Sequence, residues 1–160
     1  MRLSARICAT FAWLSLLALG TGITSPSMAE NAPQTPKWVG IIVHTTDSGP
    51  NYGKEQCDAD HKKRGFDGCG YSYMLPADGG VIEVRGDSRI GAHTLGKNKE
   101  YLGVAFIGRS TITSPQLESF SKLLTELESK FGPLEIRAHR EFNKNKTCPG
   151  DEVWEKVRDL

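Results

Sequence analysis

The sequence of 160 residues has few cysteines, no block of like charge and, beyond its first 29 residues, no long hydrophobic run. Basic and acidic residues nearly balance, at a formal net charge of +1, and they are not clustered. This argues against a nucleic-acid-binding surface. The lack of a second apolar run argues against a stable membrane span in the processed protein. The sequence also shows no internal repeat, and its length suits one domain with a buried core.

The N-terminal segment has the composition of a secretory signal peptide. Arg2 and Arg6 form a basic start, residues 7–20 are apolar and rich in Ala and Leu, and small residues follow up to Ala29. We therefore predict a signal peptide over residues 1–29 and an exported protein, either periplasmic or secreted. The alternative is an uncleaved membrane anchor that is released later.

Residues 30–37 are polar, contain two prolines and show no periodicity, so we expect a flexible linker before a domain over residues 38–160. Within the domain, β-type runs alternate with stretches of helical periodicity. This pattern predicts a single α/β domain with a central mixed β-sheet flanked by helices on both sides. The expected strands are residues 38–43, 71–75, 81–84, 102–107 and 134–138, and the expected helices are residues 52–64, 114–131 with Ser114 as the N-cap, and 151–158.

The number of cysteines after residue 29 is odd. Cys57, Cys69 and Cys148 remain there, which in an oxidising compartment favours one disulfide and one thiol with another task. If Cys148 is a metal ligand, Cys57 and Cys69 are left to form the disulfide. The alternative is three unpaired thiols, with Cys69 as a small buried residue.

Residues suited to metal binding gather between positions 136 and 149. A short β-type run delivers His139, and the polar loop after it returns Lys146 and Cys148 to the same place. Imidazole and thiolate are good zinc ligands, but two ligands do not complete a site. His44 follows the first predicted strand, at the edge where open α/β sheets place their ligands. By itself His44 is equally consistent with a simple strand cap.

Several separated motifs follow one another along the chain. They are His44 after the first strand, Gly70-Tyr71, Gly-Ala-His-Thr at 91–94, Leu-Gly-Val-Ala-Phe-Ile-Gly at 102–108, Arg-Ala-His at 137–139 and Lys-Thr-Cys-Pro at 146–149. With these motifs in this order, the chain over residues 38–155 resembles the zinc-dependent N-acetylmuramoyl-L-alanine amidases. That family includes small bacteriophage amidases and animal peptidoglycan-recognition proteins. The resemblance implies a monomeric Zn²⁺ hydrolase that cleaves the amide bond between N-acetylmuramic acid and L-alanine in peptidoglycan.

The resemblance also implies roles for individual residues. His44, His139 and Cys148 would hold the zinc, and three protein ligands leave the open position that distinguishes a catalytic zinc site. Tyr71 would position or deprotonate the attacking water, and Lys146 would stabilise the oxyanion. Without the resemblance, Tyr71 is an ordinary strand aromatic and Lys146 a solvated loop charge.

Further residues are predicted to bind substrate: Thr45, Arg85, His93 and Asn98. His93 has two alternatives, as a fourth zinc ligand or as a residue that only orders its glycine-flanked loop. Many recognition proteins carry Gly-Trp where this chain has Gly86-Asp87. The preferred third residue of the stem peptide is therefore left open.

Two other functions compete with amide hydrolysis at the sugar. One is a module of the same fold that binds peptidoglycan without cleaving it, and the other is a zinc peptidase that cuts within the stem peptide. The presence of Cys148, Tyr71 and Lys146 argues against a module that only binds.

Overall fold

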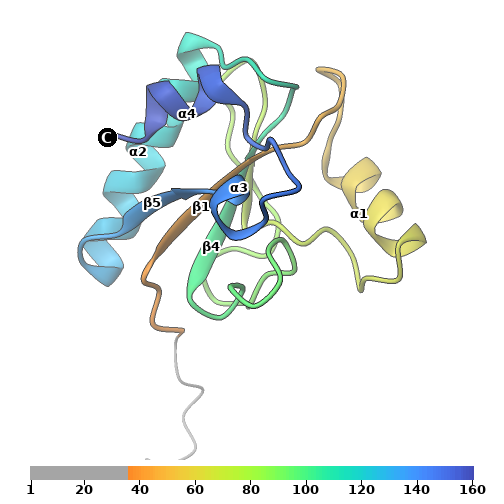
Figure 1. The fold of residues 1–160 in the computed structure, drawn as a ribbon, viewed down its shortest axis with the longest axis horizontal. Coiled ribbons are helices and arrows are strands. Elements are labelled where there is room, and N and C mark those ends of the chain that lie inside the picture. Colours follow the sequence, from red (N-terminus) through yellow and green to blue (C-terminus); the bar gives the residue numbers. More distant parts are fainter. Residues whose placement is uncertain (1–35) are drawn as a thin grey trace, which may run out of the picture. The chain divides into compact units, whose positions relative to one another are not determined.

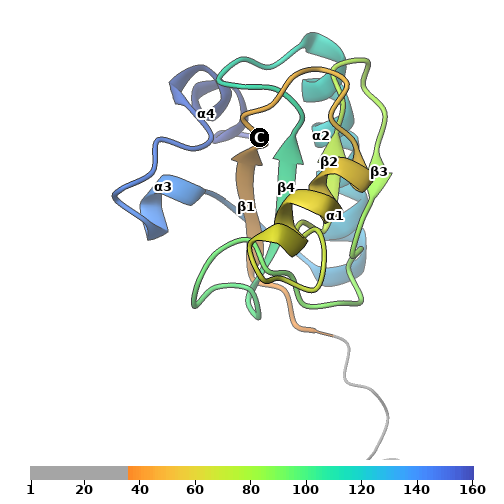
Figure 2. The ribbon, with the colours of Figure 1, turned by 90° about the vertical axis from the view of Figure 1, so that its right-hand side faces the viewer.

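The structure is a computed structural model and describes residues 36–160. Its strands are β1 (Gly40–Thr45), β2 (Tyr73–Leu75), β3 (Ile82–Glu83), β4 (Tyr101–Phe106) and β5 (Glu135–Ala138). They form one five-stranded sheet in the order β3-β2-β4-β1-β5, of which Figure 1 labels β4, β1 and β5 and Figure 2 labels β3, β2, β4 and β1. Neighbours among β2, β4, β1 and β5 run parallel, and β3 pairs antiparallel with β2. The predicted mixed sheet is therefore confirmed.

Helices cover both faces of this sheet. They are α1 (Lys54–Lys63), α2 (Ser114–Phe131), α3 (His139–Phe142) and α4 (Asp151–Val157). Side chains that alternate along a strand point to opposite faces. Leu102 and Val104 of β4 accordingly pack in one cluster with residues of α2 and α4, whereas Ala105 packs in a second cluster with Cys57 of α1. Figures 1 and 2 show α1 on one side of the sheet and α2 on the other.

The N-terminus of α2 differs from the prediction by one residue. The sequence predicts Ser114 as the N-cap, but the cap is Thr113. The Thr113 hydroxyl accepts a hydrogen bond from the Gln116 amide N–H at 3.2 Å, and the Gln116 side-chain oxygen accepts one from the Thr113 N–H at 3.0 Å. This reciprocal pair satisfies two N–H groups that a helix start leaves free. Gln116 is also buried and donates to the carbonyl oxygens of Leu75 and Ile107, which ties α2 to the ends of β2 and β4.

A short helix, α3, follows β5 where the sequence predicts a polar loop. The Glu141 carboxylate accepts hydrogen bonds from the Ala138 N–H at 2.6 Å and from Nε of Arg137 at 2.7 Å. These bonds stabilise the first turn of α3 and hold its first residue, His139, at the end of β5. A helix of four residues is too short for hydrophobic periodicity to reveal it.

Strand β2 begins at Tyr73, two residues later than predicted. If β2 began at Tyr71, the Tyr71 side chain would lie on the same face of the sheet as those of Tyr73 and Leu75. Tyr73 and Leu75 pack in one cluster with residues of α2. Tyr71 instead packs against the second cluster, on the α1 side. The irregular backbone before β2 therefore turns the Tyr71 side chain to the opposite face of the sheet.

Cys57 of α1 and Cys69 in the segment before β2 form a disulfide, in agreement with the cysteine count. His61 lies one turn further along α1, and Cys57, His61 and Cys69 offer ligand atoms within 4.8 Å of one another. Because the two sulfur atoms are bonded to each other, they are not available to a metal ion. The disulfide instead fixes α1 beside the backbone that leads to Tyr71.

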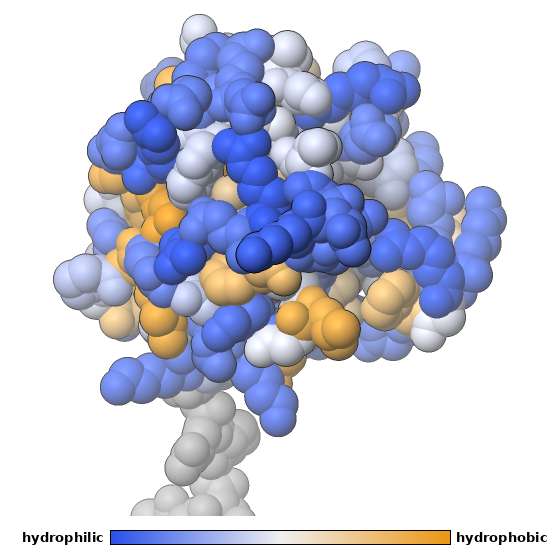
Figure 3. Space-filling view, viewed as in Figure 1, coloured by the Kyte–Doolittle hydropathy of each residue, from blue (hydrophilic) through white to orange (hydrophobic). Residues whose placement is uncertain are grey.

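The predicted signal peptide and all but the last two residues of the predicted linker lie outside the described residues. Within residues 36–160, no helix has the length and apolar character needed to cross a membrane. Hydrophilic residues cover most of the face drawn in Figure 3, and hydrophobic residues form small separate groups there. The long apolar stripe predicted for α2 is buried as core.

Candidate metal centre

Two histidines come together at the carboxyl ends of neighbouring strands. β1 and β5 run parallel and Val43 pairs with Ala138, so the next residue of each chain segment, His44 and His139, lie side by side. Their ring centroids are 4.5 Å apart. His44 belongs to β1 itself, whereas the sequence predicts it just after the strand, and only 1% of it is exposed. His44 is paired in the sheet with Ala105 of β4, whose small side chain leaves room beside the imidazole ring.

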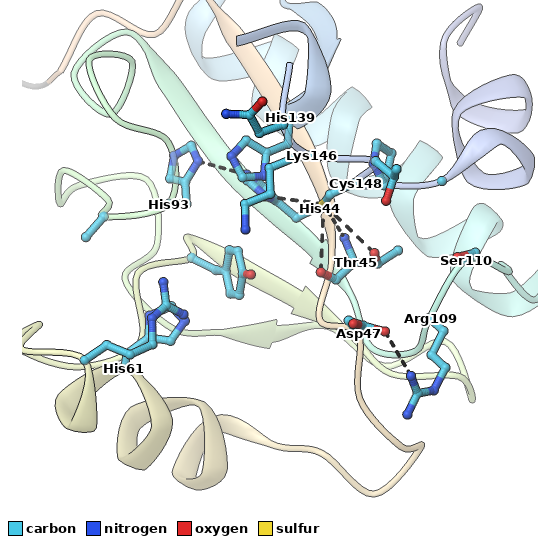
Figure 4. Close-up of a pocket in the computed structure, with 17 residues that line it drawn as sticks. His44, Thr45, Asp47, His61, His93, Arg109, Ser110, His139, Lys146 and Cys148 are labelled. Atoms are coloured by element: carbon cyan, nitrogen blue, oxygen red, sulfur yellow. Dashed lines mark hydrogen bonds and ion pairs between the residues drawn. The ribbon is translucent and has the colours of Figure 1, made fainter. Parts of the chain in front are cut away.

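Cys148 joins these two histidines from the loop after α3. The Arg140 N–H donates to the Cys148 carbonyl oxygen at 2.9 Å, which brings the end of the loop back to its start. The ligand atoms of His44, His139 and Cys148 all lie within 4.8 Å of one another. His44 Nδ1 is 3.9 Å from the Cys148 sulfur, and Figure 4 shows the three side chains around one point.

The chemistry of these three residues suits a zinc ion. A histidine must be neutral to bind a metal, and burial lowers the pKa of both His44 and His139. Two imidazoles and one thiolate are donors that zinc accepts readily, and three protein ligands leave a fourth position for a reactant. The donor set is therefore that of a catalytic rather than a closed structural site.

Thr45 supports Cys148 as a thiolate. Burial raises the pKa of the Cys148 thiol, while hydrogen bonds from Thr45 and the positive charge of Lys146 act in the opposite direction. The Thr45 N–H lies 3.3 Å from the sulfur and its hydroxyl 4.0 Å. Thr45, predicted to bind substrate, does line the cavity, but its donors point to the sulfur.

Tyr71 lies beside the histidines, with its ring centroid 5.2 Å from that of His44. The backbone before it is closely packed. The Gly70 N–H donates to His61 Nδ1 at 3.0 Å, and a Cβ at Gly70 would lie 2.1 Å from the carbonyl oxygen of Ala92, so only glycine fits there. Burial raises the pKa of Tyr71. The phenol therefore keeps its proton at neutral pH and offers a hydrogen-bond donor.

All of these side chains and Lys146 line one cavity of about 440 Å³. Arg64, Arg109 and Lys146 surround it with positive charge. Asp47 is the one acidic residue among the described residues that line it, and it forms an ion pair with Arg109 at 3.1 Å. The cavity therefore favours a ligand that carries carboxylate groups.

The cavity also includes residues that were not predicted from the sequence as site residues, among them His61, Arg64 and Arg109. His61 and Arg64 lie at the end of α1. Their sequence pattern does not distinguish them from the solvent-exposed charged residues of that helix. Arg109 lies in the loop just after the buried strand β4. Because strand-end loops often carry functional residues, this position could have marked Arg109 as a candidate site residue.

Of the remaining residues predicted to bind substrate, His93 lines the cavity and Arg85 and Asn98 do not. Burial lowers the pKa of His93 to about 4, so the ring is neutral at physiological pH. The Asn98 side-chain oxygen accepts hydrogen bonds from the backbone N–H groups of His93 and Thr94 at 2.9 and 2.8 Å. Asn98 therefore shapes the loop that carries His93.

Arg85 is engaged within the protein. Its side chain donates to the carbonyl oxygens of Cys69 and Ile90 at 2.8 and 3.1 Å and forms an ion pair with Asp67. These partners belong to the segments on either side of the β2–β3 hairpin, so Arg85 holds those segments together.

Comparison with known proteins gives several matches. A family model described as N-acetylmuramoyl-L-alanine amidase matches residues 34–151. The endolysin of Escherichia phage T7 is 30% identical over 129 residues, which cover 72% of this chain and 85% of the endolysin. Peptidoglycan-recognition protein SC2 of Drosophila melanogaster is 30% identical over 100 residues, which cover 59% of this chain and 54% of that protein. The solved structure of the N-acetylmuramoyl-L-alanine amidase LysC from Clostridium intestinale URNW is similar at a TM-score of 0.71 and 26% identity, covering 78% of this chain and 85% of LysC.

Proposed function

The chain belongs to the N-acetylmuramoyl-L-alanine amidase family, and we propose that it uses zinc to hydrolyse the amide bond between N-acetylmuramic acid and L-alanine. The family match, the phage endolysin and the LysC amidase support amidase activity on peptidoglycan. One observation carries the assignment of residues. The three candidate ligands, His44, His139 and Cys148, share a single cavity with Tyr71 and Lys146.

Each of these residues has a task in amide hydrolysis. Zinc held by His44, His139 and Cys148 would supply a Lewis acid that lowers the pKa of water and polarises a carbonyl group. Tyr71 donates a hydrogen bond from its phenol hydroxyl and so positions the attacking water. Lys146 stabilises the negative charge that develops on the amide oxygen as water adds to the acyl carbon. The carbon–nitrogen bond then breaks, and the amine of L-alanine leaves with a proton that water supplied.

The charge of the cavity supports a peptide as part of the substrate. A stem peptide carries free carboxylates, and Arg64, Arg109 and Lys146 attract such groups. Arg109 is exposed and forms an ion pair with Asp47, which a substrate carboxylate can replace. Peptidoglycan is therefore the partner that the cavity supports best.

We also propose that the protein is exported and acts as a monomer where peptidoglycan is accessible. The basic start, the limited apolar run and the small residues up to Ala29 support a cleaved signal peptide. N-terminal sequencing of protein recovered outside the cytoplasm tests this, and we expect Glu30 at or near the start. Recovery of chains that still begin at Met1 would support a releasable anchor instead.

Replacement of one ligand tests the metal site directly. We expect the zinc-loaded protein to clear a suspension of purified peptidoglycan and a chelator to stop it, with activity restored by added zinc. Cys148→Ser should lose the activity and bind zinc more weakly, because a hydroxyl is a poor substitute for a thiolate ligand. A chelated, metal-free protein that still clears peptidoglycan would contradict the mechanism, and zinc-loaded protein that only binds peptidoglycan would identify a recognition module.

A further inference from the structure

The ring of His93 forms the middle of a hydrogen-bonded chain. Its Nε2 lies 3.1 Å from the carbonyl oxygen of Tyr101, and its Nδ1 lies 3.0 Å from Nε2 of His44. A carbonyl oxygen can only accept, so Nε2 of His93 carries the hydrogen and Nδ1 of the neutral ring is an acceptor. The hydrogen between the two rings must then belong to Nε2 of His44.

This chain decides which nitrogen of His44 is free. A neutral imidazole with hydrogen on Nε2 has its lone pair on Nδ1. Nδ1 is the atom that faces Cys148, at 3.9 Å from the sulfur. The Thr94 hydroxyl lies 3.1 Å from Nδ1 of His93 and 3.4 Å from Nε2 of His44, where it can donate to the first and accept from the second. The carbonyl acceptor at Nε2 of His93 thus selects this tautomer of His44, and the Thr94 hydroxyl is compatible with it.

The protein is shaped to hold the His93 ring in this place. A Cβ at Gly103 of β4 would lie 2.5 Å from the ring, and one at Gly91 would lie 2.6 Å from it. Both glycines therefore leave space that the imidazole occupies. Asn98 fixes the backbone of His93 from the other side through its side-chain oxygen. Both ring nitrogens of His93 are thus engaged inside the protein, although the ring borders the cavity (Figure 4).

We propose that His93 is a positioning residue which, by accepting a hydrogen bond from Nε2 of His44, holds His44 in the tautomer that presents Nδ1 to zinc. The inference rests on the proposed role of His44 as a ligand and assigns His93 neither to the ligands nor to substrate binding. Hydrogen-bond partners of metal ligands fix the orientation and tautomer of the ring, and their loss typically lowers metal affinity by about 10–100-fold.

Zinc affinity of matched variants tests the proposal. His93→Phe keeps a ring in the space but removes the acceptor, so its zinc affinity should fall by about 10–100-fold. His93→Asn places an amide oxygen close to the position of Nδ1 and should keep most of the affinity. His61→Phe is the control, because His61 is another buried histidine at the cavity but bonds to the Gly70 N–H and to no candidate ligand. Thermal melts followed by circular dichroism establish that each variant is folded.

A second measurement needs no metal. Long-range ¹H–¹⁵N spectra of metal-free protein report the tautomer of each imidazole, and we expect His44 to carry its hydrogen on Nε2. A hydrogen on Nδ1 of His44, unchanged affinity in His93→Phe, or equal loss in His93→Phe and His93→Asn would each overturn the proposal. Failure of the unaltered protein to bind zinc would contradict the proposed function, and the spectra would still decide for or against this role of His93.

Discussion

At the scale of single residues, burial separates the groups proposed to hold a metal from the group proposed to meet the substrate. His44 is buried and Cys148 half-buried, whereas Lys146 is exposed at the rim of the cavity. An exposed ammonium group adds charge to the cavity without the cost of burial. Loss of Lys146 should therefore affect the reaction much more than zinc binding or stability.

Lys146→Ala is the corresponding prediction. If Lys146 stabilises the charge on the amide oxygen, its loss should lower kcat by about 10²–10³-fold while zinc stays bound. Lys144→Ala is a matched control, because Lys144 is exposed on the same loop but does not line the cavity. Steady-state hydrolysis and the zinc content of both variants provide the measurement. Equal activity of the two zinc-loaded variants would remove Lys146 from the mechanism.

The sequence was a good guide to residues in short motifs and a poor guide to those defined by long-range contacts. The structure groups His44, His139 and Cys148 as the spacing and the resemblance predicted. The partners of Arg85 and Thr45 are Cys69 and Cys148, 16 and 103 residues away, and no local pattern encodes such hydrogen bonds. Their exact contacts therefore required the structure.

At the scale of secondary-structure elements, the site depends on α1 and the segment that leads to Tyr71. The Cys57–Cys69 disulfide joins these two, and His61 of α1 accepts a hydrogen bond from the Gly70 N–H next to Tyr71. Figure 2 shows α1 in front of the sheet. The disulfide should accordingly stabilise the fold and keep Tyr71 in position.

Removal of the disulfide tests this link. The double variant Cys57→Ala, Cys69→Ala should lose about 3 kcal/mol of unfolding free energy, because the bond closes a loop between residues 12 apart. Urea unfolding of metal-free protein measures the difference, and Cys148→Ser, which keeps the disulfide, serves as the reference. If both proteins unfolded at the same urea concentration, the disulfide would contribute nothing to stability.

The sequence located a helix or strand more accurately where its hydrophobic pattern was longer. The apolar stripe of α2 and the buried run of β4 are long, and both were found within a residue or two. α3 has four residues and depends on Glu141, and β2 starts late because Tyr71 turns to the other face. Both features are determined by side-chain contacts, which periodicity does not detect.

At the scale of the whole molecule, all four histidines lie in or beside the cavity and all have lowered pKa values. Burial is the main cause in each case. The folded metal-free protein keeps these rings neutral, whereas the unfolded chain takes up protons below a pH of about 6.5. Neutral imidazole is the form that a metal ligand requires, and the folded state loses stability in acid.

The metal-free protein should become less stable as the pH falls from about 6.5 toward 4. In this window the unfolded state binds more protons, and each histidine that stays neutral contributes up to about 1.4 kcal/mol per pH unit. His93, with a pKa of about 4, should act over the whole window. Urea unfolding in the presence of a chelator between about pH 7.5 and 4.5 measures the slope. We expect His93→Asn to reduce it, and a free energy of unfolding independent of pH would contradict this account.

The central claim is that this molecule cleaves one particular bond of peptidoglycan, and analysis of the digestion products by mass spectrometry tests it most directly. Zinc-loaded protein should release stem peptides with a free L-alanine amine and leave glycan chains whose N-acetylmuramic acid residues carry free lactyl carboxylates. Cys148→Ser, treated in parallel, should release neither. Fragments cut within the stem peptide would show a peptidase, and intact muropeptides that stay bound to the protein would show a recognition module. Either result would contradict the proposed amidase.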